Sequence, residues 1–265
     1  MTAPLSEDDL IARYFAPIAG EGAFALKDDA ARYAPPPGCD LVLTCDALVA
    51  GVHFFADDPP DAIARKALRV NLSDLAAKGA DPAGFLLSLA LPADWREDDL
   101  AAFARGLGED ARAYGCPLLG GDTVKTPGPL TLSVTAFGTT PAGRMVKRFA
   151  VQAGDALYVT GTIGDAALGL ALRREAGLAP RLTPQHRDAL RERYLLPRPR
   201  LSSARAMRAH ARAGMDVSDG LVGDLTKMLR ASGVGARVEL PRGPLSDAAR
   251  AASCVDAAMV GVRGP

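Results

Sequence analysis

Aspartate side chains recur through this chain among small and apolar neighbours. The stretch DVSDGLVGDL, residues 216–225, holds three aspartates and no lysine or arginine. In one interpretation the stretch starts a helix, where Ser218 or Asp219 caps the backbone and early acids favour the helix dipole. In the other, a bound metal ion supplies the missing positive charge. The stretch alone leaves both interpretations open.

Other aspartates stand where a predicted strand stops or inside an apolar helix. Asp46 ends LVLTCD, Asp122 ends PLLGGD, and Asp74 lies within VNLSDLAA. If these elements converge, the carboxylates share one pocket, which raises their pKa values or costs several kcal/mol per buried charge unless cations neutralise them. Oxygen ligands without a cluster of His or Cys favour a hard cation, Mg²⁺ or Mn²⁺. Taken singly, Asp74 could instead be a solvated helix residue.

Glycine turns and one basic segment could bind phosphate. Gly120 and Gly121 before Asp122 free the backbone to approach a ligand, although most glycine turns are purely structural. Arg144 and Lys147 could clamp phosphate groups or simply face solvent. Several Mg²⁺ ions with a polyphosphate would explain the many acids. The sequence has no G-x-x-x-x-G-K-[ST], H-R-D or D-F-G motif, which disfavours a P-loop enzyme or a protein kinase.

Composition excludes further classes of protein. The chain has 265 residues, enough for one large domain or two medium ones. Its 31 basic and 31 acidic residues give no net charge, so no global electrostatic argument favours nucleic acid or an anionic membrane. The four cysteines show no C-x-x-C spacing, and the acidic start MTAPLSEDDL is unlike a signal peptide. We therefore predict a cytoplasmic protein with reduced thiols.

The elements that would position these residues alternate between strand and helix, which predicts a layered mixed architecture. Strands are predicted at residues 40–46, 83–92, 117–123, 130–138, 156–161 and 235–240. Helices are predicted at residues 6–19, where Ser6 and Asp9 have the spacing of a capping box, and at about 59–78, 94–115 and 165–177. Further helices are predicted on both sides of 196–201 and after the loop that begins at Asp216. In 130–138 apolar and polar residues alternate, as expected of a half-buried strand. A Pro/Gly/basic linker predicts a domain boundary near residue 142.

Seven motifs, taken in order along the chain, resemble those of one enzyme family. They are DDAA, TCDALVAGVHF, RVNLSDLAAKGADP, LLGGDT, AGRMVKR, GDALYVTGTIGDAALGLAL and DVSDGL. Together they are similar to the thiamine-monophosphate kinases, members of the ATP-binding superfamily of aminoimidazole ribonucleotide synthetase and selenophosphate synthetase. The resemblance covers about residues 6–245, and the pattern that includes His53 points to this member of the superfamily.

This resemblance implies a role for each matching position. A cluster of Mg²⁺ ions would be held by Asp29, Thr44, Asp46, Asp74, Asp122, Asp216 and Asp219. ATP, the co-substrate, would be contacted by Tyr114, Gly121, Asp122, Arg144 and Ser218. His53, which alone is more typical of a half-buried structural histidine, would meet thiamine phosphate.

The resemblance also implies a reaction, an assembly and a fold. ATP and thiamine phosphate would give thiamine diphosphate and ADP by direct in-line transfer, which suits residues that offer metals and positioning but no obvious nucleophile. Members of the family are homodimers whose N-terminal strands join into a β-barrel. We therefore expect an α+β, two-domain aminoimidazole ribonucleotide synthetase-like fold. Residues 1–142 would bind ATP and Mg²⁺ and dimerise, and residues 143–265 would form an α/β domain.

Two features depart from the family pattern. Cys45 stands where the family usually has a hydroxyl residue, and a neutral thiol is a poor Mg²⁺ ligand. The family also continues after GARVELP with a Gly-Gly-Asp/Glu-Asp-Tyr-Glu segment that this sequence lacks. The resemblance thus implies a truncated C-terminal domain and weak binding of thiamine phosphate.

Two alternative functions stay open on the sequence alone. One is another ATP-using enzyme of the superfamily, which forms an amidine or activates a phosphate and shares the metals but not the His53 contact. The other is a catalytically impaired remnant of the kinase that folds and dimerises.

Overall fold

A computed structural model of the chain describes residues 6–255, apart from 176, 178–179 and 181. Its centre is a four-stranded sheet in the order β1-β4-β2-β3. The strands are β1 (Cys39–Val49), β2 (Asp81–Pro92), β3 (Leu118–Thr126) and β4 (Thr131–Pro141). β4 pairs antiparallel with both β1 and β2, whereas β2 and β3 are parallel. The first four predicted strands are therefore confirmed, each within a few residues.

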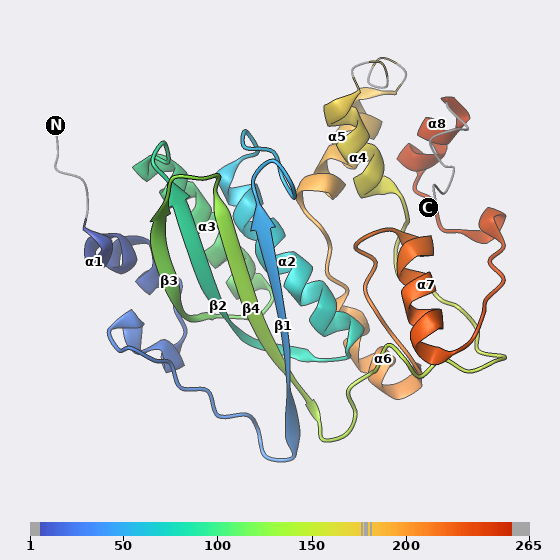
Figure 1. Ribbon diagram of the computed structural model, residues 1–265, viewed down its shortest axis with the longest axis horizontal. Helices are drawn as coiled ribbons and strands as arrows, with labels where there is room; N and C mark the ends of the chain where they lie inside the picture. Colours follow the sequence, from blue (N-terminus) through green and yellow to red (C-terminus); the bar gives the residue numbers. More distant parts are fainter. Residues whose placement is uncertain (1–5, 176, 178–179, 181, 256–265) are drawn as a thin grey trace.

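Two helices cover one face of the sheet: α2 (Pro60–Ala77) and α3 (Glu97–Ala113), which lie behind it in Figure 1. Both helices were predicted. They approach each other closely at Gly106, where a Cβ atom would lie 2.6 Å from the backbone oxygen of Asp61. The core between helices and sheet is apolar, which stabilises the layers by removing hydrocarbon from water. Its fully buried side chains include Leu68, Leu72, Leu75, Phe85, Leu89, Phe103, Leu107 and Leu132.

The alternation predicted for residues 130–138 is confirmed in β4. Leu132, Val134 and Ala136 are buried on the helix-covered face, while Ser133 and Thr135 between them are half-buried. The other face of the sheet carries exposed apolar side chains on three strands. These are Leu41 (41 % exposed), Leu43 (63 %), Leu86 (41 %) and Val124 (49 %).

The N-terminal segment starts as predicted. Helix α1 (Glu7–Leu10) is capped by Ser6, whose hydroxyl oxygen accepts a hydrogen bond from the backbone N–H of Asp9 at 3.2 Å. The chain then continues through the short irregular helical turns η1 (Ile11–Phe15), η2 (Ala16–Ile18) and η3 (Glu21–Leu26).

The second half of the chain is helical and lies beside α2 (Figure 1). It contains α4 (Asp165–Arg174), α5 (Pro184–Leu195), α6 (Ala204–His210), α7 (Leu221–Ser232) and α8 (Asp247–Val255), with the short turns η5 (Leu201–Ser203) and η6 (Leu240–Arg242). Helices α4, α5 and α8 share a small apolar core that includes Leu168, Leu172, Leu190 and Ala249. This half therefore has its own, smaller hydrophobic centre.

The strands predicted at 156–161 and 235–240 are wrong. Both segments run as irregular chain, and Tyr158 is 87 % exposed. Among the described residues, the sheet contains only β1 to β4. A strand is stable only when a neighbouring strand satisfies its backbone N–H and C=O groups, and an isolated pair of strands is marginal. Local β-propensity in these two segments is therefore not enough to form a strand.

The two glycines of β3 allow a matched test of how closely β3 must approach β2. A Cβ at Gly121 would lie 1.8 Å from the backbone oxygen of Leu87, whereas a Cβ at Gly120 would meet only the side chain of Leu86, at 3.5 Å. We expect Gly121→Ala to lower the free energy of unfolding by about 3 kcal/mol or more, and Gly120→Ala to change it by less than about 1 kcal/mol. Urea denaturation measures both values, and equal losses would show that strand approach does not require the glycine.

Candidate active site

Three of the predicted carboxylates come together from three separate elements. Asp46 lies on β1, Asp74 on α2, and Asp216 in the segment that leads to α7. Burial raises the pKa of Asp46, and the negative charge of Asp74 raises it further. Burial, followed by the charge of Asp74 and a hydrogen bond with it, raises the pKa of Asp216 to about 7. This acid cluster (Asp46, Asp74 and Asp216) therefore concentrates negative charge.

The hydroxyl of Thr44 joins the same cluster. Its Oγ1 donates a hydrogen bond to Asp74 Oδ2 at 2.6 Å, linking β1 to α2. Cys45 lies on the other face of β1, where its sulfur is 3.4 Å from Ser133 Oγ and accepts from Thr135 Oγ1 at 3.3 Å. Because adjacent strand residues point to opposite faces, the thiol is directed away from the acid cluster.

Asp46 was predicted to end its strand, and this prediction is wrong. β1 continues to Val49 because Ala47, Leu48 and Val49 pair with residues 131–133 of β4. Asp46 instead shares the helix-covered face with Val42 and Leu48, since residues two apart in a strand point the same way. The face of the strand, rather than its end, therefore brings Asp46 towards Asp74.

Asp122 also lies inside its strand rather than at its end. It pairs in register with Ser88 of β2, and both side chains are exposed. Leu86 and Val124, on the same face as this pair, are likewise exposed. Asp122 therefore sits on the open face of the sheet, and the structure does not join it to the acid cluster.

Lys78 is a member of the site that sequence reasoning missed. Its Nζ donates a hydrogen bond to the backbone oxygen of Gly214 at 2.9 Å, two residues before Asp216. Burial lowers the pKa of Lys78, while the charges of Asp74 and Asp216 oppose that change. The available signal was its spacing: Lys78 follows Asp74 by four residues, which places both on one side of α2.

The stretch 216–225 contains a cation contact and a backbone contact. The N-cap of α7 is Gly220, without a side-chain hydrogen bond, so the interpretation in which Ser218 or Asp219 caps the helix does not hold. The buried carboxylate of Asp224 instead accepts the backbone N–H groups of Ser218 and Asp219, both at 2.9 Å. Lys227 pairs with Asp219 and, at 3.0 Å, with Asp224. Asp216 is thus the aspartate of this stretch that belongs to the acid cluster.

His53 lies in the turn that follows β1. Its side chain is exposed, and its Nδ1 accepts the backbone N–H of Val49 at 3.0 Å. In the neutral ring the proton is then on Nε2, which can donate to an anion. The charge of His53 also counteracts the rise in the pKa of Asp46. The turn therefore places His53 near the acid cluster and outside the core.

The remaining predicted residues are spread over other elements. Asp29 is exposed in a bend between η3 and β1. The ring of Tyr114, just after α3, lies 5.6 Å from the guanidinium carbon of Arg69. Arg144 is exposed and donates to the backbone oxygen of Arg208 on α6 at 3.0 Å. The structure therefore connects none of these three side chains to the acid cluster by a direct contact.

The acid cluster suits a hard cation by the chemistry of its donors. Carboxylate and hydroxyl oxygens are preferred by Mg²⁺, and the raised pKa of Asp216 shows that a positive charge would be favourable there. Across the described part of the chain, however, no three His, Cys, Asp or Glu side chains are already grouped closely enough to hold a metal ion. Asp46, Asp74 and Asp216 therefore lie near one another without forming such a group.

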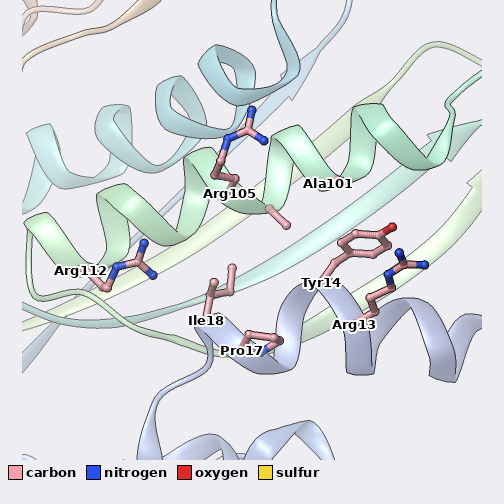
Figure 2. Close-up of a pocket in the computed structure, with 8 residues that line it drawn as sticks. Arg13, Tyr14, Pro17, Ile18, Ala101, Arg105 and Arg112 are labelled. Carbon is pink, nitrogen blue, oxygen red and sulfur yellow. The ribbon is translucent and has the colours of Figure 1, made fainter.

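The hollow in Figure 2 is separate from this site. It is a cavity of about 210 Å³ between the N-terminal segment and α3. Its lining includes Arg13, Tyr14, Ile18, Arg105 and Arg112. None of the residues predicted to bind metal, ATP or thiamine phosphate lines it.

The fold and the site identify the class of protein first. Residues 27–140 match the family model for the N-terminal domain of AIR synthase related proteins, and residues 152–260 match that for the C-terminal domain. The chain thus has a two-domain AIR synthase-like fold of mixed α and β content.

Curated relatives narrow the class to one family. A thiamine-monophosphate kinase of Caulobacter vibrioides is 47 % identical over 252 residues, covering 94 % of this chain and 70 % of the relative. The Escherichia coli K12 thiamine-monophosphate kinase is 42 % identical over 246 residues, covering 91 % and 74 %. This chain belongs to the thiamine-monophosphate kinase family.

Solved structures agree with this assignment. The thiamine-monophosphate kinase of Stenotrophomonas maltophilia K279a superposes with a TM-score of 0.78 at 41 % identity, over 86 % of this chain and 74 % of that one. A structure of AaThiL complexed with AMPPCP and TMP gives 0.77 at 31 % identity, over 96 % and 80 %. Within the residues described here, no helix combines the length and apolar character needed to cross a membrane.

Asp216→Asn tests whether the acid cluster is electrostatically strained in the metal-free protein. The pKa of Asp216 is higher in the folded chain than the ordinary value of 3.8. Its ionisation therefore costs folding stability as pH rises from about 4 through about 7. We expect Asn to raise the free energy of unfolding at pH 8 by about 1–2 kcal/mol, allowing for solvent screening, and to give no gain at pH 4.

Chemical denaturation in EDTA at both pH values measures this effect. Asp219→Asn is the matched control, because Asp219 is exposed and paired with Lys227. If Asp216→Asn destabilises the protein at pH 8, Asp216 is a structural partner instead.

Proposed function

We propose that this chain transfers the γ-phosphoryl group of ATP to thiamine phosphate, giving thiamine diphosphate and ADP. The observation that carries the proposal is the acid cluster, assembled by β1, α2 and the segment before α7 in a member of this kinase family. A related structure holds AMPPCP and TMP together. The cluster offers carboxylates and a hydroxyl rather than a covalent nucleophile, which favours direct in-line transfer with catalysis by positioning and charge.

Mg²⁺ ions are part of the proposal. Asp46, Asp74, Asp216 and the hydroxyl of Thr44 would hold them, because Thr44 and Asp216 both bond to Asp74 and the charges of Asp46 and Asp74 act on each other. Asp29, Asp122 and Asp219 would contribute further ligands once nucleotide is bound. The ions would neutralise the charge of the phosphates. Lys78 would keep Asp216 in place through its bond to Gly214.

We also propose the groups that bind the two substrates. ATP would be contacted by Tyr114, Gly121, Asp122, Arg144 and Ser218. His53 would donate from Nε2 to the phosphate of thiamine phosphate. Its support is its exposed place in the turn after β1, within electrostatic reach of Asp46. The acceptor phosphate would then lie beside the acid cluster.

The proposed assembly is a homodimer in the cytoplasm, with a domain boundary between residues 142 and 143. The exposed apolar side chains on the open face of the sheet support a partner surface that a second sheet could cover, closing a barrel. They are Leu41, Leu43, Leu86 and Val124. A reducing compartment is supported by the free thiols Cys39, Cys45 and Cys116.

ADP release from the purified chain tests the function directly. We expect release in Mg²⁺ and ATP to depend on thiamine phosphate. Turnover with another phosphate acceptor, or with none, would assign the chain to a different member of the superfamily.

We further expect His53→Ala to raise the KM for thiamine phosphate about tenfold or more, with nearly unchanged KM for ATP, because only a contact to the acceptor is lost. An equal rise of the KM values for both substrates would show that His53 has a structural role.

Asp219→Asn tests whether the 216–225 stretch binds metal. The substitution keeps size and removes charge, and its ion pair with Lys227 is exposed, so the melting temperature should change little. We expect affinity for an inert ATP analogue in Mg²⁺ to fall about tenfold, measured by calorimetry.

Glu192→Gln is the control for Asp219→Asn, because it removes one carboxylate from another exposed ion pair, with Arg198. If Asp219→Asn binds the analogue as tightly as the wild type, Asp219 pairs with Lys227 but does not bind metal.

A further inference from the structure

Arg173 of α4, in the second half of the chain, binds the turn that carries His53. We call residues 50–58 the His53 turn. Arg173 forms ion pairs with Asp58 at 3.0 Å and Asp57 at 2.7 Å, and its guanidinium carbon lies 4.5 Å from the centre of the Phe55 ring. Three residues of one short turn therefore meet a single side chain that is more than 110 positions away in sequence.

The bond to Asp58 matters most among these contacts. The Asp58 side chain is 1 % exposed, whereas that of Asp57 is 80 % exposed. An exposed ion pair contributes little, but a buried carboxylate without its cation is strongly destabilised. Asp58 Oδ2 also accepts the backbone N–H of Phe55 at 3.0 Å, which closes the end of the His53 turn. Arg173 therefore stabilises the one carboxylate that shapes the turn.

Aromatic and cation–π contacts around Phe55 support the same end of the His53 turn. The Phe55 ring packs 5.9 Å from that of Tyr194 on α5, and the ammonium group of Lys66 lies 3.7 Å from the centre of the Tyr194 ring. Lys66 is buried, which lowers its pKa to about 8, and the charge of Asp58 opposes this change. Helices α2, α4 and α5 thus meet at the end of the His53 turn.

The start of the His53 turn is fixed by the first half of the chain. Phe54 is buried in the main core, and the N–H of Ala50 donates to the oxygen of Leu130 at 2.9 Å. His53 Nδ1 bonds to the N–H of Val49. His53 is therefore located between an anchor in the first half and an anchor, Arg173, in the second.

We propose that Arg173 is a positioning residue for the phosphoryl transfer. It holds the far end of the His53 turn, so that both halves of the chain set where His53 meets the acceptor. This inference rests on the proposed function in one respect only, the assignment of His53 to thiamine phosphate. Arg173 is not among the groups proposed to bind either substrate, so its loss would let the turn move without removing any group proposed to bind ATP.

Steady-state kinetics of Arg173→Gln, with Arg174→Gln as the matched control, tests the proposal. Arg174 is the next residue on α4 and shares none of the contacts described above with residues 55–58. We expect Arg173→Gln to raise the KM for thiamine phosphate about tenfold and to leave the KM for ATP within about twofold. Arg174→Gln should leave both constants unchanged. Arg173→Lys, which keeps the charge but loses the forked geometry, should fall between the two.

The partners of Arg173 sharpen the test. Asp57→Asn should have no effect, because that carboxylate is exposed. Asp58→Asn should raise the KM for thiamine phosphate about as much as Arg173→Gln, and the double variant should be no worse than either single one. Equal rises in both KM values, or a lower melting temperature with unchanged KM values, would show that Arg173 is only structural and would overturn the proposal.

Hydrogen exchange separates this proposal from the proposed function. We expect the backbone amides of residues 50–58 to exchange faster in Arg173→Gln than in the wild type or Arg174→Gln. If the wild type does not use thiamine phosphate but exchange still rises, the proposed function fails and the anchoring by Arg173 stands. If the wild type uses thiamine phosphate and Arg173→Gln changes neither exchange nor KM, the inference fails and the function stands.

Discussion

The burial of α2 is the constraint on which both the fold and the site depend. Leu68, Leu72 and Leu75 are fully buried along this helix between the sheet and α3. Each such side chain contributes about 1.5–3 kcal/mol relative to an exposed one. That packing fixes the rotation of α2 about its axis. The rotation places the carboxylate of Asp74 within hydrogen-bond distance of the Thr44 hydroxyl. The position of Asp74 is therefore set by apolar contacts on another side of the same helix.

Electrostatics then explains how the folded chain holds the carboxylates of the acid cluster close together. Like carboxylates that approach in a partly buried site favour a proton on one of them, and Asp216 accordingly has a pKa of about 7. Lys78 supplies a nearby positive charge without forming an ion pair, since its ammonium group bonds to Gly214. Proton and ammonium together moderate the repulsion between the acids of the cluster.

Sequence alone predicted the elements whose signals are local. The Ser6 cap, helix α2 and the alternation in β4 each follow from neighbouring residues, and all three are confirmed. Pairing between distant segments is not encoded in this way, so residues 156–161 had the composition of a strand without a partner. For the site, the approach of Asp46 to Asp74 was predicted, but the length of β1 and the part played by Lys78 were not. Both depend on which residues of another element lie opposite.

The two halves of the chain are joined around the acid cluster rather than at a distance from it. Lys78 bonds to Gly214, and Arg208 of α6 forms an ion pair with Asp81 at 3.0 Å, both within a few residues of the end of α2. On the other side, Arg173 joins α4 to the His53 turn. Since Asp74 belongs to the first half and Asp216 to the second, any shift of one half against the other changes the separation of these two carboxylates. Cation binding would favour the arrangement in which they are closest, and polar contacts across the junction would carry that preference to the His53 turn. Under the proposed function, the acceptor and the cation would thus both bind beside this junction between the halves.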